Sequence, residues 1–320
     1  PPLCAMMISA KSSRKGLSTM SKKVVVIGLG HLGAHVSQML ALRGIADEIV
    51  GIDYNKKKEW GEIQDLSDML PYLGTQTKIR SGSYEDLADA DIAVLTACGK
   101  ICDEDRLQEL SGSIAVIDQI LPEVQKNHFH GTMVVLTNPC DLIAYYVNQK
   151  IDADVIGTGT ALDSARLRSR VAATLNLAPS DIQGYCIGEH GDSQTILWSQ
   201  TRVGGVLADK LLTPDQMLQI EQDTISAGCE IALHKGSTEF GIGMAACEII
   251  QAILGDEHRI LPCSVDPKGV YGQSGLFTSV PCIISREGAV PLKELDLTSD
   301  EMAKFTASCD MLKNMIQKMS

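Results

Sequence analysis

Short apolar runs and helical periods alternate along the first half of the chain. The run KVVVIG over residues 23–28 is rich in β-branched residues and is flanked by Lys and Gly, which is typical of a strand buried on both faces. Apolar positions then recur at 32, 36, 39, 40 and 42, the spacing of one helix face, and Gly44 is placed to end that helix. A second apolar run over residues 48–52 ends at Asp53. The pattern predicts strand, helix and strand in succession.

The same alternation continues well beyond this first unit. Further strands are predicted over residues 78–80, 91–96, 132–137 and 155–157, with helices over 60–70 and 107–126 and a short helix or turn over 83–87. Strands that alternate with helices in this way are typical of a parallel sheet covered by helices on both faces. We therefore predict the α/β class, with a doubly wound parallel (Rossmann) sheet in the N-terminal part.

From about residue 150 the pattern changes to longer helices and clustered short strands. Helices are predicted over residues 161–175, 214–234, 241–254 and 298–317, and strands over 182–187, 259–265, 269–271 and 280–284. This order predicts an α+β domain. We divide the chain into a leader over residues 1–19, a parallel-sheet domain over 20–150 and an α+β domain over 151–320.

The leader is interpreted separately because it shows no element of its own. It begins with Pro, contains basic and serine residues but no acid, and its apolar run is too short for a secretory signal. Met20, followed by SKKVVVIG, is a natural start. We expect residues 1–19 to be upstream or non-native sequence without structure.

Composition and charge narrow the class of protein. The net charge is −12 without a basic run, which argues against nucleic acid or an anionic membrane as partner, and no apolar stretch reaches the ~20 residues of a spanning helix. The ten cysteines form no C-x-x-C pair and none has a His at zinc-ligand spacing. We therefore expect reduced thiols, a cytoplasmic protein and no metal site.

The glycines after the first strand suggest a dinucleotide site. Gly28, Gly30 and Gly33 form G-x-G-x-x-G between a strand and a helix, and Asp53 follows 20 residues after Gly33 at the end of the next strand. The glycines permit a tight turn, close approach to a pyrophosphate and close packing of helix on strand, while the acid accepts bonds from ribose hydroxyls. The alternative is an ordinary turn between two strands. Because Asp53 repels a 2′-phosphate, NAD is favoured over NADP.

Two polar segments follow later strands of the predicted sheet. One, over residues 97–106, is irregular and ends with Arg106, and the other, over 138–141, begins with Asn138. Ligands bind at the carboxyl ends of parallel strands, so both segments are expected to face the cofactor. Alternatively, Arg106 is a surface residue paired to a neighbouring acid, and Asn138 caps a helix.

Three ionisable residues stand out between residues 157 and 194. Asp163 and Arg166 lie one helical turn apart, and His190 follows in a Gly-Glu-His-Gly turn. Taken singly, they are an ordinary helix ion pair and a polar turn histidine. Together they provide an acid, an imidazole that titrates near neutral pH and a guanidinium suited to a carboxylate. The combination predicts a site that moves a proton and holds a carboxylate.

At this point five motifs resemble one family. GLGHLG with Asp53, TNPCD (137–141), GTGTALDSAR (157–166), GEHGDSQ (188–194) and KGSTEFGIG (235–243) occur in the order and spacing of the L-lactate and malate dehydrogenase superfamily. The resemblance covers residues 23 to about 317 and is closest to the L-2-hydroxyisocaproate dehydrogenases. It implies an NAD-dependent oxidoreductase that acts on 2-hydroxy acids and assembles as a homotetramer or homodimer.

The resemblance also implies a role for individual residues. His190 would exchange the proton with the substrate oxygen, Asp163 would orient the imidazole, and Arg166 would bind the substrate carboxylate. Arg106 would polarise the substrate carbonyl, and Asn138 would orient the substrate. Thr238 would line the substrate side of the pocket. The residues implied at the cofactor are Gly28, Gly30, Leu32, Gly33, Asp53, Thr96, Ala97, Asn138 and Ile242.

The loop before Arg106 departs from the family pattern and bears on the substrate. It is shorter than usual, and the position that reads the substrate side chain falls at Ile101 or Cys102. No cation stands at 101–105, and three acids there would repel a dicarboxylate such as oxaloacetate. An apolar Ile101 predicts a 2-oxo monocarboxylic acid with a larger apolar side chain, as in 2-oxoisocaproate. An L-lactate dehydrogenase proper and a non-catalytic NAD-binding paralogue remain as alternatives.

Overall fold

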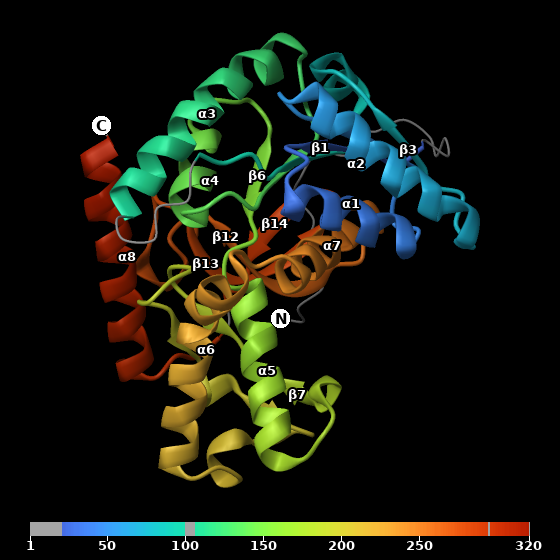
Figure 1. Cartoon of the computed structure of the whole chain (residues 1–320). Helices are drawn as coiled ribbons and strands as arrows, with labels where there is room; N and C mark the ends of the chain where they lie inside the picture. Colours follow the sequence, from blue (N-terminus) through green and yellow to red (C-terminus); the bar gives the residue numbers. More distant parts are fainter. Residues whose placement is uncertain (1–20, 100–105, 294, 320) are drawn as a thin grey trace, which may run out of the picture.

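The computed structural model describes residues 21–99, 106–293 and 295–319 of the chain. Within these residues, one sheet of nine strands runs through the molecule in the order β14-β13-β12-β6-β5-β4-β1-β2-β3 (Figure 1). Its strands are β1 (Lys23–Ile27), β2 (Glu48–Ile52), β3 (Lys78–Ser81), β4 (Ile92–Leu95), β5 (Thr132–Val135), β6 (Asp154–Gly157), β12 (Arg259–Val265), β13 (Thr278–Ser285) and β14 (Gly288–Pro291).

Six of these strands form the predicted doubly wound parallel sheet. β1 lies in the middle, where Val25 pairs with Val50 of β2 on one side and with Ala93 of β4 on the other. All five residues of β1 are buried, because helices cover both faces of the sheet. The strand order reverses between β1 and β4, so the carboxyl ends of these strands open at a topological switch point. The α/β prediction is confirmed.

The other three strands come from the second half of the chain and extend the same sheet. β12, β13 and β14 are antiparallel to one another, and β12 joins β6 through a bridge between Ser264 and Gly157. A Cβ atom on Gly157 would lie 2.8 Å from the Cβ of Ser264, so glycine is needed where the two halves meet. The sheet is therefore continuous between the two halves.

Eight α-helices, counted over the described residues, surround the sheet. They are α1 (His31–Leu42), α2 (Lys56–Met69), α3 (Arg106–Lys126), α4 (Cys140–Asn148), α5 (Ala161–Leu175), α6 (Pro214–Lys235), α7 (Phe240–Leu254) and α8 (Ser299–Met319). α1 packs against α7, and α5 against α6, with which it extends away from the sheet (Figure 1). α8 contacts α4 on the other side.

One apolar core extends through both halves of the chain. It includes Val25 of β1, Leu142 of α4, Ile250 of α7, Val280 of β13 and Phe305 of α8, each 1% exposed or less. A second, smaller core lies beneath α5 and α6 and contains residues such as Leu167 and Ile220. No helix in the described part of the chain has the length and apolar character needed to cross a bilayer.

Several predicted elements of the second half differ in the structure. Residues 269–271 were expected to be a strand but lie in a 3₁₀ turn, Val270–Gly272, because Gly269 and Tyr271 adopt positive φ angles of 91° and 53°. The strand expected over 182–187 divides into β7 (Ile182–Gln183) and β8 (Cys186–Ile187), which belong to different small sheets. These sheets are completed by β9 (Thr195–Ile196), β10 (Arg202–Val203) and β11 (Val206–Leu207), which were not predicted.

Candidate active site

The turn between β1 and α1 is built from glycines that the geometry requires. Gly28 has φ +101°, and a Cβ atom on it would lie 2.8 Å from the backbone nitrogen of Ala97. A Cβ atom on Gly33 would lie 1.9 Å from the carbonyl oxygen of Gly28, so any larger residue would push α1 off the strand. Around Gly30, by contrast, no atom lies within 4 Å of such a Cβ. The turn is closed on its protein side and open at Gly30.

Asp53 lies beside this turn at the end of β2 and is buried, with 8% exposure. Its carboxylate accepts hydrogen bonds from the backbone N–H groups of Leu29 and Asn55, each at 2.8 Å. Its own backbone N–H donates to Glu59 Oε2 at 2.8 Å. The glycine turn and the acid are therefore one rigid unit. The contact from Glu59, which lies in α2, could not be predicted from the sequence motif.

The end of β4 adjoins the same turn. Thr96 Oγ1 donates to the carbonyl oxygen of Gly28 at 2.7 Å, and Ala97 N donates to Ile27 O at 3.1 Å. Thr137 Oγ1, at the end of β5, donates in turn to Ala97 O at 2.8 Å. The structure thus brings Thr96 and Ala97 to the glycine turn. Leu32 lies in the first turn of α1 and is half-buried.

These features fit a dinucleotide with a diphosphate at its centre. Within the described residues, no side chain caps the start of α1 and no acid lies in its first turn, so the helix N-terminus can receive an anion. Gly30 leaves room for close approach of the diphosphate. The two oxygens of Asp53 can accept from ribose hydroxyls, and their negative charge opposes a 2′-phosphate. The residues present fit NAD.

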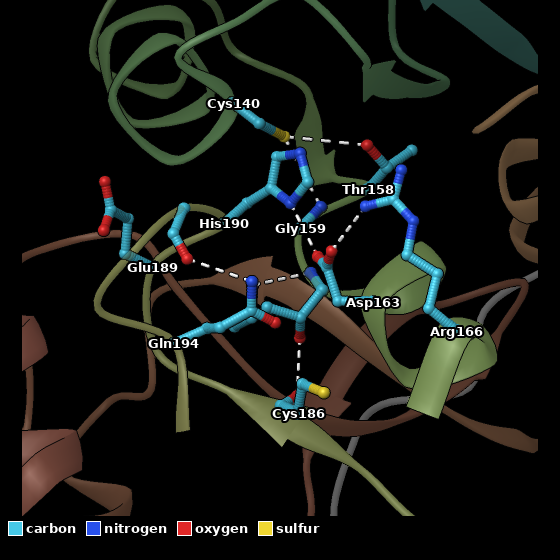
Figure 2. A network of polar contacts seen from close by, with 12 residues as sticks. Cys140, Thr158, Gly159, Asp163, Arg166, Cys186, Glu189, His190 and Gln194 are labelled. Atoms are coloured by element: carbon cyan, nitrogen blue, oxygen red, sulfur yellow. Dashed lines mark hydrogen bonds and ion pairs between the residues drawn. The ribbon is translucent and has the colours of Figure 1, made fainter. Parts of the chain in front are cut away.

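The three ionisable residues predicted to act together are in direct contact. Asp163, in the first turn of α5, accepts from Arg166 Nη1 through Oδ1 at 2.9 Å and pairs through Oδ2 with His190 Nδ1 at 2.6 Å. Figure 2 shows Asp163 between the imidazole and the guanidinium. The Asp163 side chain is 1% exposed, whereas that of His190 is 22% exposed. The imidazole thus uses Nδ1 for Asp163, which leaves Nε2 for a substrate.

This contact sets the charge state of the pair. Burial by itself lowers the pKa of His190, but the charge of Asp163 and its hydrogen bond outweigh burial and raise the pKa above its ordinary value. Burial likewise raises the pKa of Asp163, and the opposing effects of His190 and Arg166 bring it below the ordinary value. Asp163 is therefore ionised near neutral pH, and the imidazolium is favoured. An imidazole with this bias can donate a proton to an oxygen anion.

The main chain of the His190 turn is held by side chains from two helices. Asp141 Oδ2, in α4, accepts from the backbone N–H of His190 at 2.7 Å, and Ser308 Oγ, in α8, accepts from the backbone N–H of Glu189 at 2.9 Å. Asp141 lies in the TNPCD motif but was assigned no role from the sequence, and Ser308 lies outside every motif. Neither contact has a local pattern that could have revealed it.

The start of α7 packs against α1, the helix that follows the glycine turn. A Cβ atom on Gly243 would lie 2.9 Å from Met39 Sδ, which shows how closely α7 packs on α1. His35 of α1 contacts the ring of Phe240 edge-on, with centroids 4.7 Å apart. Ile242 is 8% exposed at this junction, and Thr238 is half-buried just before α7. Both residues therefore lie where the two halves meet.

The loop that carries the remaining predicted residues is only partly described. Ile101 and Cys102 lie outside the described residues. Arg106, expected as the last residue of the loop, is the first residue of α3. Asn138 is exposed, and its backbone carbonyl accepts from Ser113 Oγ at 3.0 Å. In the part of the chain that is described, no group of three or more His, Cys, Asp or Glu residues could hold a metal ion.

Comparison with protein families gives two matches that together cover most of the chain. Residues 22–155 match the lactate/malate dehydrogenase, NAD binding domain, and residues 160–320 match the lactate/malate dehydrogenase, alpha/beta C-terminal domain.

Relatives and solved structures match over nearly the whole length. L-lactate dehydrogenase 3 of Bacillus cereus is 37% identical over 305 residues, which cover 92% of this chain and 96% of the relative. The ligand-bound minor L-lactate dehydrogenase from Enterococcus mundtii superposes with a TM-score of 0.90 at 34% identity and covers 94% of this chain and 99% of its own. The malate dehydrogenase of Cryptosporidium parvum gives a TM-score of 0.89 at 28% identity, with 93% and 99% covered.

Proposed function

Since this chain belongs to the lactate/malate dehydrogenase family, its reaction is the NAD-dependent interconversion of a 2-hydroxy acid and a 2-oxo acid, and we propose that its substrate is an L-2-hydroxy monocarboxylic acid with an apolar side chain larger than methyl. The observation that carries the chemistry is the bridge from His190 through Asp163 to Arg166. It joins a proton donor and a carboxylate-binding group through one buried acid.

The proton transfer is the task of His190. In the direction of reduction, Nε2 of the imidazolium donates to the substrate oxygen, while Asp163 holds Nδ1 and stabilises the positive charge. In the reverse direction the neutral imidazole accepts the hydroxyl proton. Bound NADH supplies the hydride, held beside the glycine turn and Asp53.

Two arginines and an amide position the substrate in this proposal. Arg166 is 10% exposed and, while Nη1 bonds Asp163, retains further N–H donors for the substrate carboxylate. Arg106 polarises the carbonyl and Asn138 orients it, with Thr238 on the substrate side. From the sequence alone, the position that reads the substrate side chain is expected at Ile101 or Cys102. These assignments have their support in the sequence motifs and in the position of Arg166.

The preference for a larger side chain has one structural support, at Gly228. This glycine lies inside α6, where it costs about 1 kcal/mol of helix stability relative to alanine, so its presence calls for a packing reason. A Cβ atom on it would lie 3.7 Å from Arg166 Nη1 and 4.0 Å from Nη2. An added Cβ atom would be in ordinary van der Waals contact with the guanidinium, so the glycine leaves room for about one methyl group beside it. That space favours a branched substrate over pyruvate.

A substrate panel tests the proposed function. NADH consumption is measured with pyruvate, 2-oxoisocaproate, phenylpyruvate and oxaloacetate. We expect kcat/KM to be highest for 2-oxoisocaproate or phenylpyruvate. A maximum at pyruvate would identify an L-lactate dehydrogenase proper, the activity named for the relatives, and a tenfold preference for oxaloacetate would contradict the proposal. NADH binding without turnover of any 2-oxo acid would support a non-catalytic paralogue. His190→Asn should remove most of the turnover while NADH still binds.

The space at Gly228 has its own test. Gly228→Ala should lower kcat/KM for 2-oxoisocaproate about tenfold more than for pyruvate, since a pocket discriminates by ~1–3 kcal/mol per methylene. The matched control is Gly61→Ala in α2, where no atom lies within 4 Å of the added Cβ. An equal loss on both substrates would contradict a role for Gly228 in specificity.

We also propose that the protein is a homotetramer or homodimer, as the family resemblance implies. Light scattering coupled to size-exclusion chromatography measures the mass in solution. A mass of about one 34.4 kDa chain would contradict this.

A further inference from the structure

Asp141 lies behind the catalytic histidine and has no role in the reaction described so far. It occupies the first turn of α4, is 3% exposed and accepts from the backbone N–H of His190 at 2.7 Å. Its other oxygen, Oδ1, is buried without a hydrogen-bond partner among the described residues, and so is Oγ of Ser264. A neutral amide could accept the same bond without the several kcal/mol that burial of a charge costs. The charge therefore needs an explanation.

The charged groups around the imidazole come from two helices. Asp163 and Arg166 face it from α5, and Asp141 faces it from α4. Asp163 and Asp141 both favour the imidazolium, whereas Arg166 opposes it. Asp141 is thus the second carboxylate of the site, placed on the main-chain side of His190.

The surroundings of Asp141 move its pKa toward neutral pH. Burial raises the pKa of Asp141 to about 6, and the charge of Glu189 adds to this effect. The hydroxyl of Ser264, the backbone N–H of His190 and the His190 charge act in the opposite direction. The thiol of Cys140 lies beside it on α4, and that of Cys309 faces it from α8. Above about pH 6, Asp141 is therefore ionised and its charge reaches His190.

We propose that Asp141 is a positioning residue for the proton transfer, which fixes the main chain of His190 and places a second negative charge behind its imidazole. The inference rests on the proposed function of His190 as the proton donor. One side chain then performs two tasks, since the same carboxylate orients the ring through its backbone and keeps the proton on it. Ser308, which holds the adjacent N–H of Glu189 without a charge, performs only the first task.

The test compares Asp141→Asn with the wild type. The amide oxygen can still accept from His190 N, so the variant removes the charge and keeps the anchor. The His190 imidazole is titrated by NMR in the full-length protein, with its signal identified by comparison with His190→Asn. We expect its midpoint to fall. In kinetics, the loss of kcat/KM for reduction as the pH rises should begin at a lower pH than in the wild type. At high pH the variant should therefore lose about threefold more activity, relative to the wild type, than it loses at low pH.

Two further variants make the result decisive. Ser308→Ala removes the neighbouring anchor, so it should leave the His190 midpoint unchanged whatever it does to the rate. Ser264→Ala removes the hydroxyl that lowers the pKa of Asp141, so it raises that pKa further and should lower the His190 midpoint, by less than Asp141→Asn does. If Asp141→Asn does not fold, Ser264→Ala decides alone.

The outcomes separate the two claims. An unchanged His190 midpoint in the variants that fold would overturn the role of Asp141. Because the titration needs no substrate, it stays informative if no 2-oxo acid is turned over. Absence of turnover in the wild type would instead overturn the proposed function.

Discussion

At the scale of the residue, the site depends on one buried acid whose two carboxylate oxygens bond two different side chains. Asp163 Oδ2 bonds the imidazole and Oδ1 accepts from the guanidinium, so His190 and Arg166 are fixed relative to each other. Because its side chain is 1% exposed, water does not screen these contacts. In the proposed reaction, this rigid spacing would match the distance between the reacting oxygen and the carboxylate of the substrate.

Asp163→Asn is expected to slow reduction and to move its pH dependence. The charge of Asp163 raises the pKa of His190, so its removal lowers that pKa. Reduction needs the imidazolium, and its kcat/KM should therefore be lost at lower pH than in the wild type. Loss of ring orientation should reduce the rate by roughly 10²–10⁴-fold as well. Initial rates from pH 5 to 9 measure both effects.

A control for this prediction is Arg166→Lys. It keeps the positive charge but loses the paired N–H geometry, so KM for the 2-oxo acid should rise while the pH midpoint changes little. If Asp163→Asn left the pH profile where it is in the wild type, the acid would not set the charge of His190.

The sequence revealed the reacting side chains of this site but not the groups behind them. Asp163, Arg166 and His190 are in contact as predicted, because each belongs to a short motif with its own chemistry. Asp141 and Ser308 act on backbone N–H groups 49 and 119 residues away in the chain. A bond to a backbone N–H carries no residue-type signal on the donating side. Such contacts become visible only when the fold brings the segments together.

At the scale of the element, the turn from β1 to α1 contains two glycines whose surroundings differ. At Gly33 the helix touches the strand, whereas at Gly30 the added atom would enter open space. Gly33 is therefore required by the fold, whereas we predict that Gly30 is required by the ligand.

This difference predicts opposite outcomes for two alanine variants. Gly33→Ala must displace α1, so it should lower the free energy of unfolding by several kcal/mol and weaken NADH binding. Gly30→Ala should keep the stability of the wild type within about 0.5 kcal/mol and still weaken NADH binding about tenfold or more, because the Cβ atom occupies the approach to the diphosphate. Urea unfolding and NADH fluorescence titration measure the two quantities. Tight NADH binding by Gly30→Ala would place the diphosphate elsewhere.

Strands and helices were predictable to different degrees in the two halves of the chain. The parallel strands were found because burial on both faces leaves continuous apolar runs such as KVVVIG. β7 to β11 have two residues each, too few for any period to show. β14 was missed because it follows β13 after a turn at Arg286–Glu287 and its own pattern is mixed. The turn at Val270–Gly272 was mistaken for a strand because the positive φ of Tyr271 cannot be inferred from its residue type.

At the scale of the whole molecule, the continuous sheet joins segments that are far apart in sequence. β6 belongs to the parallel half and β12 to the antiparallel half, and a shared core runs beneath both. We predict that the protein unfolds in a single thermal transition and that saturating NADH raises this transition as a whole. Differential scanning calorimetry measures it. Two resolved transitions, with only the first shifted by NADH, would show that the halves unfold separately.

The sharing of Asp163 between two cations also has a consequence for charge balance during turnover. In the proposed reaction, a protonated His190 and Arg166 exceed Asp163 by one positive charge, and the carboxylate of Asp141 behind the ring offsets that charge before substrate binds. Transfer of the proton removes one positive charge from His190, while loss of the hydride leaves one positive charge on the nicotinamide. The net charge around the substrate carboxylate is therefore the same before and after the reaction. A new proton from solvent then resets His190, and because it adds a positive charge beside the oxidised nicotinamide, its uptake is electrostatically coupled to departure of the cofactor.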